Sequence, residues 1–512
     1  MKKKEETLKK QRRGRKKKEL DTRLLTPEQQ AFIEKEEKID KINEKMNRPI
    51  IGMTYLCGFL VIGLIAYILH FMITQKDEVI ANAANTRLDS YAADVDRGDI
   101  VTKDGKTVAT NKNGKRYYPY DDLFAHAVGY SEYTKAGVEL VGNYYLMKSH
   151  ANILERAVHT LREEQNEGDT VVTTLNYELQ KTAYDALGEA DGAVVLLEPD
   201  TGRILAMVSK PDFDPNDIDT VWEEANSEGS TSSVLLNRAT QGLYPPGSTF
   251  KVLTTLSFMR QNRKYSKYTY DCSQSQAVFN GVTVHCYDNK THGEQDLSEA
   301  LANSCNQAFA DIGTQLNVNK WRDTLESFLF NQSLPYTDAS ANSRFVLDGK
   351  SDKGYIPQTA FGQGDTLITP LHNAMIVSTI ANGGLMMKPY MIDSVENYKG
   401  KRIRKFSPAS YDTLMTSDEV DTLTGYMRKV VTEGTAAPYF SDASYEAAGK
   451  TGTAEYANGE HDFSWFIGFT SVDHPEVAIS VVVEESDVNG VKASAIARKM
   501  FDAYYNLSLI HI

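Results

Sequence analysis

The sequence predicts an α/β protein of the α+β kind, in which one mainly antiparallel sheet packs on helices beside a helical subdomain. Strand-like runs stand at both ends of the large C-terminal segment, near residues 193–208 and 464–483, whereas helical periodicity fills its middle. A smaller, turn-rich segment, residues 75–165, comes before it, and a 24-residue apolar run, residues 50–73, precedes both. We therefore expect one membrane-spanning helix, one small domain and one large domain of residues 169–506.

The charge of the chain is divided between a basic N-terminal tail and an acidic remainder. Residues 1–48 contain 17 Lys/Arg and 10 Asp/Glu, whereas the rest of the chain contains 39 and 59. A basic run also suits a nucleic-acid tail, but the acidity of the large part argues against nucleic acid as a partner. Within the tail, Thr26-Pro27-Glu28 opens a Glu/Lys-rich segment, which predicts a solvated helix over residues 26–46.

The apolar run explains the basic tail. Residues 50–73 contain no Asp, Glu, Lys or Arg. As a helix they would span about 36 Å, enough to cross a hydrocarbon core of about 30 Å. Basic residues precede the run and Lys76-Asp77-Glu78 follows it, so the positive-inside rule makes residues 1–49 a cytoplasmic tail. The rest of the chain then lies outside the cell membrane, as an extracellular or periplasmic domain on a single-pass anchor.

The two domains that follow the apolar run differ in their predicted secondary structure. In the small domain, residues 97–109 predict two short strands around an Asp-Gly turn, and residues 136–150 predict a helix. No catalytic constellation is present there, which indicates a scaffold. In the large domain we expect strands, helices and hairpins at these positions: strand 171–175, helix 177–187, strand pairs 193–199 with 204–208 and 464–470 with 477–483, and a final helix 493–504.

The first chemical motif is Tyr244-Pro245-Pro246-Gly247-Ser248-Thr249-Phe250-Lys251-Val252. Prolines and a glycine precede an apolar helical run, which places Ser248 at or near a helix N-terminus as a favoured cap, with Lys251 one turn further on the same face. A lysine there can take the serine's proton if burial or a second cation lowers its pKa. Alone, Ser-x-x-Lys is short enough to occur by chance.

Two further motifs follow in order. Ser304-Cys305-Asn306 lies on a predicted helix, residues 297–312, whose apolar residues recur at helical spacing. Lys450-Thr451-Gly452-Thr453 follows a strand-like run, and its small residues would let a ligand backbone lie along the strand edge. Ser304 comes 56 residues after Ser248, and Lys450 a further 146 residues on.

Ser-x-x-Lys, Ser-x-Asn and Lys-Thr-Gly in this order form the motif set of penicillin-binding proteins and serine β-lactamases. The chain resembles a monofunctional, class B penicillin-binding protein, a peptidoglycan D,D-transpeptidase, from the apolar run to about residue 506. Further resembling stretches lie in both domains: residues 97–100, 137–139, 190–211, 361–364, 369–371 and 465–469. The resemblance makes residues 75–165 a pedestal or dimerisation-like domain and residues 169–506 the transpeptidase domain. No resemblance to a glycosyltransferase module is visible.

The resemblance implies acyl transfer through a serine ester, without a cofactor or a metal. Lys251 would deprotonate Ser248, which attacks the penultimate D-Ala carbonyl of a stem peptide. The oxyanion hole would be the backbone N–H groups of Ser248 and Thr453, and such a donor lowers the barrier by about 3–4 kcal/mol. Ser304 and Lys450 would relay a proton to the departing D-Ala.

The remaining motif residues would bind the substrate. Asn306 would hold the peptide amide, and Thr451 and Thr453 the terminal carboxylate, with Gly452 leaving room between them. The implied partners are peptidoglycan stem peptides, β-lactam antibiotics and a membrane glycan polymerase of the shape, elongation, division and sporulation family.

Three alternatives share part of this pattern. A D,D-carboxypeptidase would carry the same three motifs, and the pedestal and anchor favour the transpeptidase. A β-lactamase needs a base that activates water, and the nearest imitation, residues 326–331, has the wrong spacing and predicts an amphipathic helix. A membrane β-lactam sensor would need cytosolic output machinery, for which residues 1–48 are too short.

The four cysteines have different expected states. Cys57 lies in the membrane span and Cys305 on the buried helical stripe, so both should stay reduced. Cys272 and Cys286 flank a predicted turn at Asn280-Gly281, and a disulfide between them could add about 3 kcal/mol of stability. The alternative is a zinc site of two cysteines and two histidines: Cys272, His285, Cys286 and His292.

The chain ends abruptly with Leu507-Ser508-Leu509-Ile510-His511-Ile512 after the predicted final helix. These residues are compatible with the codons of a sequencing adapter. We therefore expect residues 507–512 to be a non-native scar.

Overall fold

The computed structural model describes residues 26–74, 95–151, 161–162, 165–456 and 461–510. The chain forms two compact units, Met1–Ile80 and Ala81–Ile512. The basic run of residues 1–20 and the triplet Lys76-Asp77-Glu78 lie outside the described residues.

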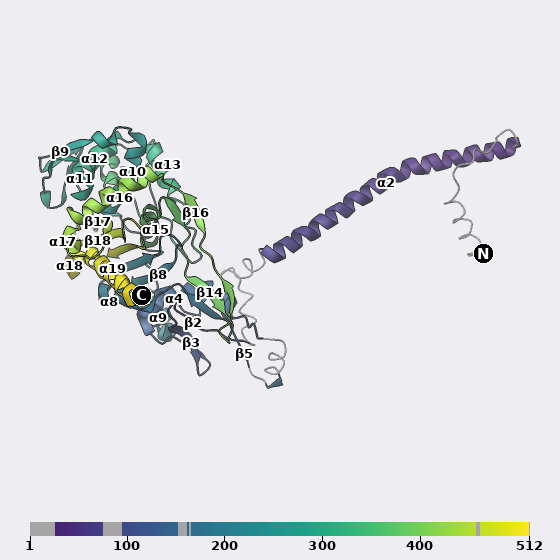
Figure 1. Cartoon of the computed structure of the whole chain (residues 1–512), viewed down its shortest axis with the longest axis horizontal. Helices are drawn as coiled ribbons and strands as arrows, with labels where there is room; N and C mark the ends of the chain where they lie inside the picture. Colours follow the sequence, from purple (N-terminus) through teal and green to yellow (C-terminus); the bar gives the residue numbers. More distant parts are fainter. Residues whose placement is uncertain (1–25, 75–94, 152–160, 163–164, 457–460, 511–512) are drawn as a thin grey trace. The chain divides into compact units, whose positions relative to one another are not determined.

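The first unit contains one long helix, α2 (Pro27–Thr74), drawn in purple in Figure 1. The sequence predicts two separate segments here, but the helix runs through Pro49 without a break. An interior proline removes one i→i−4 hydrogen bond and favours a kink, and here the helix continues on both sides of it. Within the described part of the chain, α2 is the one helix long and apolar enough to cross a membrane. Its apolar side chains, Phe59 and Ile62 among them, are exposed.

The second unit is built on a five-stranded antiparallel sheet with the order β17-β18-β19-β7-β8. Its strands come from both ends of the large domain: β7 (Gly192–Leu197), β8 (Ile204–Lys210), β17 (Ala447–Tyr456), β18 (His461–Thr470) and β19 (Val477–Val483). The predicted pairs, β7 with β8 and β18 with β19, are both present. Every residue of β19 is buried, and successive strand residues face opposite sides, so helices cover both faces of the sheet.

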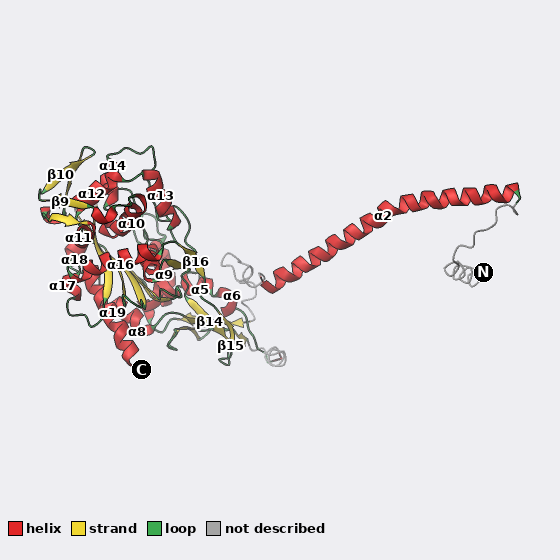
Figure 2. Cartoon of the chain, turned by 45° about the horizontal axis from the view of Figure 1, so that its top comes forward, coloured by secondary structure: helices red, strands yellow, loops and turns green. Residues whose placement is uncertain are grey.

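Three helices provide that cover. α8 (Tyr177–Leu187) and α19 (Ala493–Ile510) pack together on one face, and α15 (Pro370–Ala381), buried along its whole length, packs on the other. The bounds of α8 match the prediction. α19 runs to Ile510, beyond the predicted end at 504, so the expected scar begins inside a helix and its non-native origin stays a prediction. The α+β fold with an antiparallel sheet packed on helices is thus confirmed (Figure 2).

A helical subdomain lies beside the sheet, as predicted. It consists of five helices: α10 (Lys251–Gln261), α11 (Leu297–Ala302), α12 (Asn306–Gln315), α13 (Val318–Ser327) and α14 (Tyr355–Ala360). Its core is aromatic: the ring of Trp321 lies 6.2 Å from that of Phe250 and 5.1 Å from that of Phe345. α16 (Ser417–Thr432) packs against β17, α10 and α11 and thereby joins the subdomain to the sheet.

Between α10 and α11 the chain forms a small projection, residues 269–296, which we call the β-arm. It contains two antiparallel strand pairs: β9 (Thr269–Cys272) with β12 (Gly293–Asp296), and β10 (Gln276–Phe279) with β11 (Val282–His285). The β10–β11 turn contains Asn280 and Gly281, both with positive φ, as the sequence predicts for a tight hairpin.

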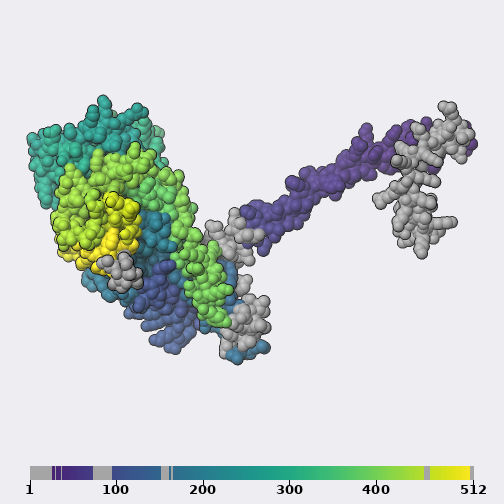
Figure 3. Space-filling view, in the orientation of Figure 1, coloured from purple at the N-terminus to yellow at the C-terminus, as the bar shows by residue number. Residues whose placement is uncertain are grey.

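A second, six-stranded sheet has the order β15-β14-β6-β2-β3-β4. Its strands are β2 (Ile100–Val101), β3 (Thr107–Lys112), β4 (Lys115–Tyr117), β6 (Thr170–Thr173), β14 (Ile392–Glu396) and β15 (Arg402–Lys405). The predicted hairpin within residues 97–109 is present as β2–β3. Two strands from far along the chain complete this sheet, and in Figure 3 the green residues near 400 lie beside the blue N-terminal ones.

The helix predicted over residues 136–150 is broken into α5 (Gly137–Val141) and α6 (Asn143–Leu146). Gly142 separates them, and a Cβ there would lie 2.8 Å from the carbonyl oxygen of Val138. α5 supplies Glu139, a fully buried carboxylate that accepts hydrogen bonds at 2.6 Å from Arg97 and from Arg116. This buried ion triad ties the start of the small domain to its helices.

The remaining elements are short. They are strands β1 (Val95–Asp96), β5 (Asn166–Glu167), β13 (Leu385–Met387) and β16 (Ser410–Thr413), helices α4 (Ala125–Val128), α9 (Ile218–Ala225), α17 (Ala437–Phe440) and α18 (Ser486–Asn489), and 3₁₀ turns η3 (Asp121–Phe124), η4 (Pro215–Asp217), η5 (Gly247–Phe250), η6 (Tyr265–Lys267) and η7 (Tyr287–Asn289).

Candidate active site

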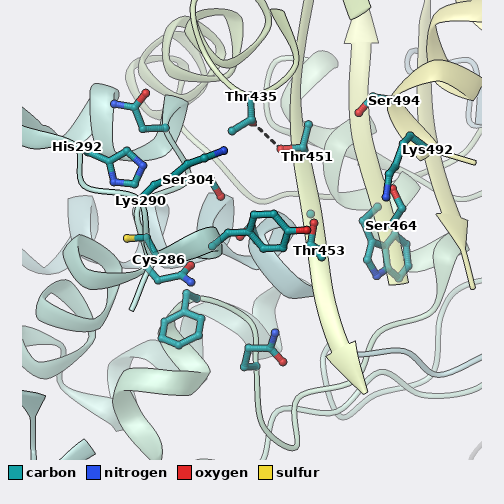
Figure 4. A pocket seen from close by; sticks show the side chains of 18 of the residues that line it. Cys286, Lys290, His292, Ser304, Thr435, Thr451, Thr453, Ser464, Lys492 and Ser494 are labelled. Carbon is teal, nitrogen blue, oxygen red and sulfur yellow. Dashed lines mark hydrogen bonds between the residues drawn. The ribbon is translucent and has the colours of Figure 1, made fainter. Parts of the chain in front are cut away.

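The three predicted motifs meet in one open cleft of about 470 Å³ between the helical subdomain and the edge strand β17. Ser248, Ser304 and Asn306 line it from the helical side, and Thr451 and Thr453 from the strand. Figure 4 shows Ser304 on one side and Thr451 and Thr453 facing it from β17. Chain segments more than 140 residues apart thus converge around Ser248.

Ser248 lies near a helix N-terminus, as the sequence predicts, because α10 begins at Lys251. It is not the predicted cap, since it lies inside the 3₁₀ turn η5. Backbone contacts hold this turn. Gly247 has φ +52 and donates its N–H to the carbonyl of Gly362 at 3.0 Å, and a Cβ on Gly247 would lie 2.6 Å from the carbonyl oxygen of Thr453. The backbone beside Ser248 is therefore in close contact with the backbone of Thr453.

Lys251 is fully buried and its Nζ lies at the centre of a polar network. It donates hydrogen bonds to the carbonyl oxygen of Ser304 and to Oδ1 of Asn306, both at 2.7 Å. The hydroxyls of Ser248, at 2.9 Å, and of Ser304, at 3.2 Å, complete its surroundings. A neutral amine has two N–H groups and one lone pair, so two oxygens can take the N–H groups while a hydroxyl donates to the lone pair.

Ser304 lies in a turn and not within a continuous helix, so the helix predicted over residues 297–312 is wrong in its middle. α11 ends at Ala302 and α12 begins at Asn306, with Ser304 at φ +56 between them. The apolar periodicity continues across the turn because both helices bury the same side, which hides the break from a pattern search. The turn brings Oγ of Ser304 to 3.0 Å from Nζ of Lys450.

Lys450 lies within β17 and is also fully buried. Its Nζ donates to the carbonyl of Thr451 at 2.8 Å as well as contacting Ser304. Ser304 Oγ therefore bridges the two buried lysines, which no spacing argument could show.

Burial removes both lysine ammonium groups from water and so disfavours their charged forms. It lowers the pKa of Lys251 to about 7. Burial, and then the positive charge of Lys251, lower the pKa of Lys450 well below its ordinary value. A lysine with a pKa of about 7 can accept a proton at neutral pH, which a solvated lysine cannot do efficiently.

Several cleft residues carried no recognisable sequence signal. Thr435 lies in the loop between α16 and α17, and its Oγ1 is 2.6 Å from Oγ1 of Thr451, the contact drawn as a dashed line in Figure 4. Lys290 lines the cleft from the β-arm, and Lys492 from the loop before α19. Trp465, by contrast, belongs to one of the stretches that resemble the family. It donates its ring N–H to the carbonyl of Pro245 at 3.0 Å.

No Asp or Glu is among the described residues that line the cleft. Glu326, the nearest sequence imitation of a hydrolytic base, lies on α13 and accepts a hydrogen bond from Arg322 at 2.9 Å. The described cleft therefore contains serine and lysine groups for acyl transfer, but no carboxylate to activate water.

The possible disulfide between Cys272 and Cys286 is not formed in the structure. The Sγ atoms of Cys272 and Cys286 are 3.8 Å apart, whereas a disulfide requires about 2.05 Å. The structure does contain a cluster of thiols and imidazole, but it differs from the alternative zinc set in one member. His285 lies outside the cluster, whereas Cys305, which we expected to be a reduced, buried thiol, belongs to it. Cys272, Cys286, His292 and Cys305 place their side-chain ligand atoms within 4.8 Å of one another.

Comparison with protein-family models gives two matches. A model described as the penicillin binding protein transpeptidase domain matches residues 192–502, and one described as the penicillin binding protein A dimerisation domain matches residues 97–171. The first covers more than half of the chain.

Curated relatives and solved structures agree with these matches. The chain is 29% identical over 493 residues to the peptidoglycan D,D-transpeptidase PbpA of Mycolicibacterium smegmatis, covering 88% of this chain and 98% of that protein. It is 30% identical to PbpA of Mycobacterium tuberculosis, covering 83% and 92%. A structure of penicillin-binding protein A from M. tuberculosis, an imipenem acyl-enzyme complex, aligns with a TM-score of 0.72 and 28% identity over 82% of this chain and 100% of that one. The D,D-transpeptidase domain of a peptidoglycan glycosyltransferase from Eggerthella lenta also gives 0.72, at 29% identity over 81% and 99%.

Proposed function

Since the chain belongs to the family of penicillin-binding protein transpeptidases, we propose that it crosslinks peptidoglycan stem peptides through an acyl-enzyme on Ser248. It is a serine-type D,D-transpeptidase. Ser248 Oγ lies 2.9 Å from the buried Nζ of Lys251, whose pKa is lowered to about 7. This contact is the observation that supports Ser248 as the nucleophile.

In the acylation step Lys251 removes the proton of Ser248, and Oγ forms a bond to the carbonyl carbon of the penultimate D-Ala. The developing oxyanion is held by the backbone N–H groups of Ser248 and Thr453. The contact of Gly247 with the Thr453 carbonyl supports this pairing, because it brings the two backbones together. One such donor is worth about 3–4 kcal/mol of barrier.

Attack by Ser248 gives a tetrahedral intermediate that carries the oxyanion. Its collapse breaks the C–N bond between the two D-Ala residues, and the leaving amine of the terminal D-Ala needs a proton. Ser304 lies between Lys251 and Lys450 and provides a route for it. In the second step an amine of a neighbouring stem attacks the ester carbonyl, gives up a proton by the same route and releases Ser248. A β-lactam forms the same ester, but its amine stays tethered to the acyl group, so Ser248 stays blocked.

The substrate lies along β17, which is the edge strand of its sheet and has backbone groups available for pairing. Thr451 and Thr453 hold the terminal carboxylate, with Thr435 bonded to Thr451 beside it. Gly452 has no room for a side chain: a Cβ would lie 2.9 Å from that of Trp465. Asn306 holds the peptide amide through Nδ2, which in the free protein donates to the carbonyl of His285 at 3.1 Å.

We propose the following organisation for the whole chain. Residues 1–49 are a cytoplasmic tail, 50–73 the membrane span, 75–165 the pedestal and 169–506 the catalytic domain outside the membrane. The candidate span in α2 supports a membrane anchor. A membrane glycan polymerase of the shape, elongation, division and sporulation family would supply the nascent strands.

A D,D-carboxypeptidase is the second candidate, because its acyl-enzyme is the same and only the acceptor differs. The experiment that separates the two supplies polymerised lipid II to the purified, detergent-solubilised chain together with a glycan polymerase. The products are then digested and analysed by mass spectrometry. Crosslinked muropeptides that need Ser248 support the transpeptidase, whereas D-Ala release without crosslinks would show a carboxypeptidase.

A further inference from the structure

A compact cluster of three thiols and one imidazole borders the active-site cleft. Cys272, Cys286 and Cys305 are essentially fully buried, and His292 is half-buried. Cys286 and His292 also line the cleft, on the side of Ser304 in Figure 4. None of the four side chains has a role in the acyl transfer described above.

Three of the six distances within the cluster match the edges of a tetrahedron around one zinc ion, and all six are within 4.8 Å. Zn–S bonds of about 2.3 Å and Zn–N bonds of about 2.0–2.1 Å at tetrahedral angles require S···S edges of about 3.8 Å and S···N edges of about 3.6 Å. The Sγ of Cys286 lies 3.8 Å from that of Cys272 and 3.7 Å from that of Cys305. The Sγ of Cys272 lies 3.6 Å from Nδ1 of His292.

Cysteine usage in the chain favours a metal over a disulfide. The chain has four cysteines, and the three that follow α2 all belong to this cluster. A disulfide would leave an unpaired thiol next to the active site, in a domain that we place outside the membrane, where thiols oxidise. A metal uses all three thiols, together with His292.

The β-arm has little else to hold it together. Along β9, β10, β11 and β12 the fully buried residues are few: Cys272, Val284 and Gln295. Such a small segment cannot form a hydrophobic core of its own, a case in which proteins commonly use a structural metal. The four ligands come from the end of β9, the residue after β11, the residue before β12 and the start of α12, so one ion would join both strand pairs to a helix.

The fourth ligand, Cys305, connects this metal site to the catalytic motif. Cys305 lies between Ser304 and Asn306, in the turn where Ser304 has φ +56. Its Sγ also accepts the N–H of Ala308 at 3.4 Å, as the N-cap of α12. Fixing Cys305 therefore fixes the two neighbours that contact Lys251.

We propose that Cys272, Cys286, His292 and Cys305 bind one structural zinc ion, which holds the Ser304–Asn306 turn in its active geometry. The site is closed, with four protein ligands, and takes no part in the chemistry itself. The second half of the proposal, the effect on the turn, rests on the proposed function; the first half does not.

The test measures metal directly on the purified, full-length chain in detergent. Elemental analysis should give one zinc per chain, and cobalt exchanged into the site should show the thiolate charge-transfer and d–d bands of a tetrahedral, sulfur-rich centre. Cys272→Ser should lose the metal, melt at a lower temperature and react with labelled penicillin about tenfold or more slowly. Cys57→Ser, which changes the one cysteine outside the cluster, should match the wild type in metal, melting and acylation.

Three further variants keep the outcome decisive. His292→Cys preserves four ligands and should retain zinc, whereas His292→Ala should bind it weakly. If a variant fails to fold, the cobalt spectrum of the wild type decides whether the site exists. Ser248→Ala should keep the zinc while losing acylation, so loss of the site and loss of the catalytic function are distinguishable. A folded, penicillin-reactive wild type without bound metal, or one with a Cys272–Cys286 disulfide in its peptide map, would overturn the proposal.

Discussion

Nζ of Lys251 lies 2.9 Å from Oγ of Ser248, and the lysine that makes this contact is completely buried. The two residues are three positions apart, but their contact depends on the change from the η5 turn to α10 between them. The same Nζ contacts Ser304 and Asn306. The first two motifs therefore meet at the Nζ atom of Lys251.

The pH dependence of acylation should follow Lys251. Burial lowers its pKa to about 7, so the neutral base predominates above that pH and the ammonium below it. The second-order rate of acylation by a fluorescent penicillin should be constant above pH 8 and fall about tenfold per unit well below pH 7. A rate that stays level from pH 5.5 to 8.5 would contradict this role.

Removing the amine should stop acylation without unfolding the protein. Lys251→Met replaces a buried amine with an apolar side chain of similar length, and should lower the acylation rate by about 10²–10⁴-fold. Because desolvation of the lysine is also removed, the melting temperature should not fall. Stopped-flow acylation and thermal unfolding of the same preparation measure the two effects.

Thr435 should position the hydroxyl of Thr451, for which we propose a role in binding the substrate carboxylate. Thr435→Val removes the 2.6 Å contact between them and should lower the acylation rate by about tenfold, the value of one hydrogen bond. The matched control is Thr432→Val on the exposed side of α16, which should leave the rate unchanged. Equal effects of the two substitutions would show that Thr435 has no specific role.

Gly362 should accept no side chain. It has φ +86, and a Cβ would lie 1.9 Å from the carbonyl oxygen of Gly247, so Gly362→Ala must displace the turn that carries Ser248. We expect a lower melting temperature and loss of acylation. Gly425→Ala is the control: it lies in α16 with open space around it, and should raise stability by up to about 1 kcal/mol.

The buried triad of the small domain should be important for stability and not for chemistry. Burial alone would raise the pKa of Glu139, but the guanidinium groups of Arg116 and Arg97 lower it below its ordinary value. Its stabilising effect is thus present above the unfolded pKa and lost as the pH falls below it. Glu139→Gln should cost about 3–5 kcal/mol in urea unfolding at pH 7.

The control for that substitution is Asp185→Asn, which breaks an exposed pair with Lys181 on α8. It should change the free energy of unfolding by less than about 1 kcal/mol. A loss as large as that of Glu139→Gln would mean that burial of the triad is not the cause.

Much of the fold follows from local patterns. The strands of the central sheet and the helix α8 are recognisable because apolar runs, turn residues and helical spacing agree there. The break at Ser304 is not recognisable, since α11 and α12 bury the same side of the chain. The full second sheet is also not recognisable, because β14, which carries β15 at its other edge, pairs with β6 more than 200 residues earlier.

The candidate site is likewise only partly predictable from the sequence. The motif residues Ser248, Lys251, Ser304 and Lys450 are found from order and spacing, although their mutual distances are not. Thr435 has no motif and is visible only as a neighbour of Thr451 in space. The cluster of Cys272, Cys286, His292 and Cys305 differs from both expected arrangements, the disulfide and the zinc set with His285, because its third thiol, Cys305, comes from the start of α12, outside the β-arm.

The most direct test of the account is to locate the covalent adduct. The purified chain is labelled with penicillin, digested and mapped by mass spectrometry. We predict one penicilloyl group on the peptide that contains Ser248, and none in a Ser248→Ala protein that has the melting temperature of the wild type. An adduct that persists in Ser248→Ala, or that maps to another serine in the wild type, would contradict the central claim.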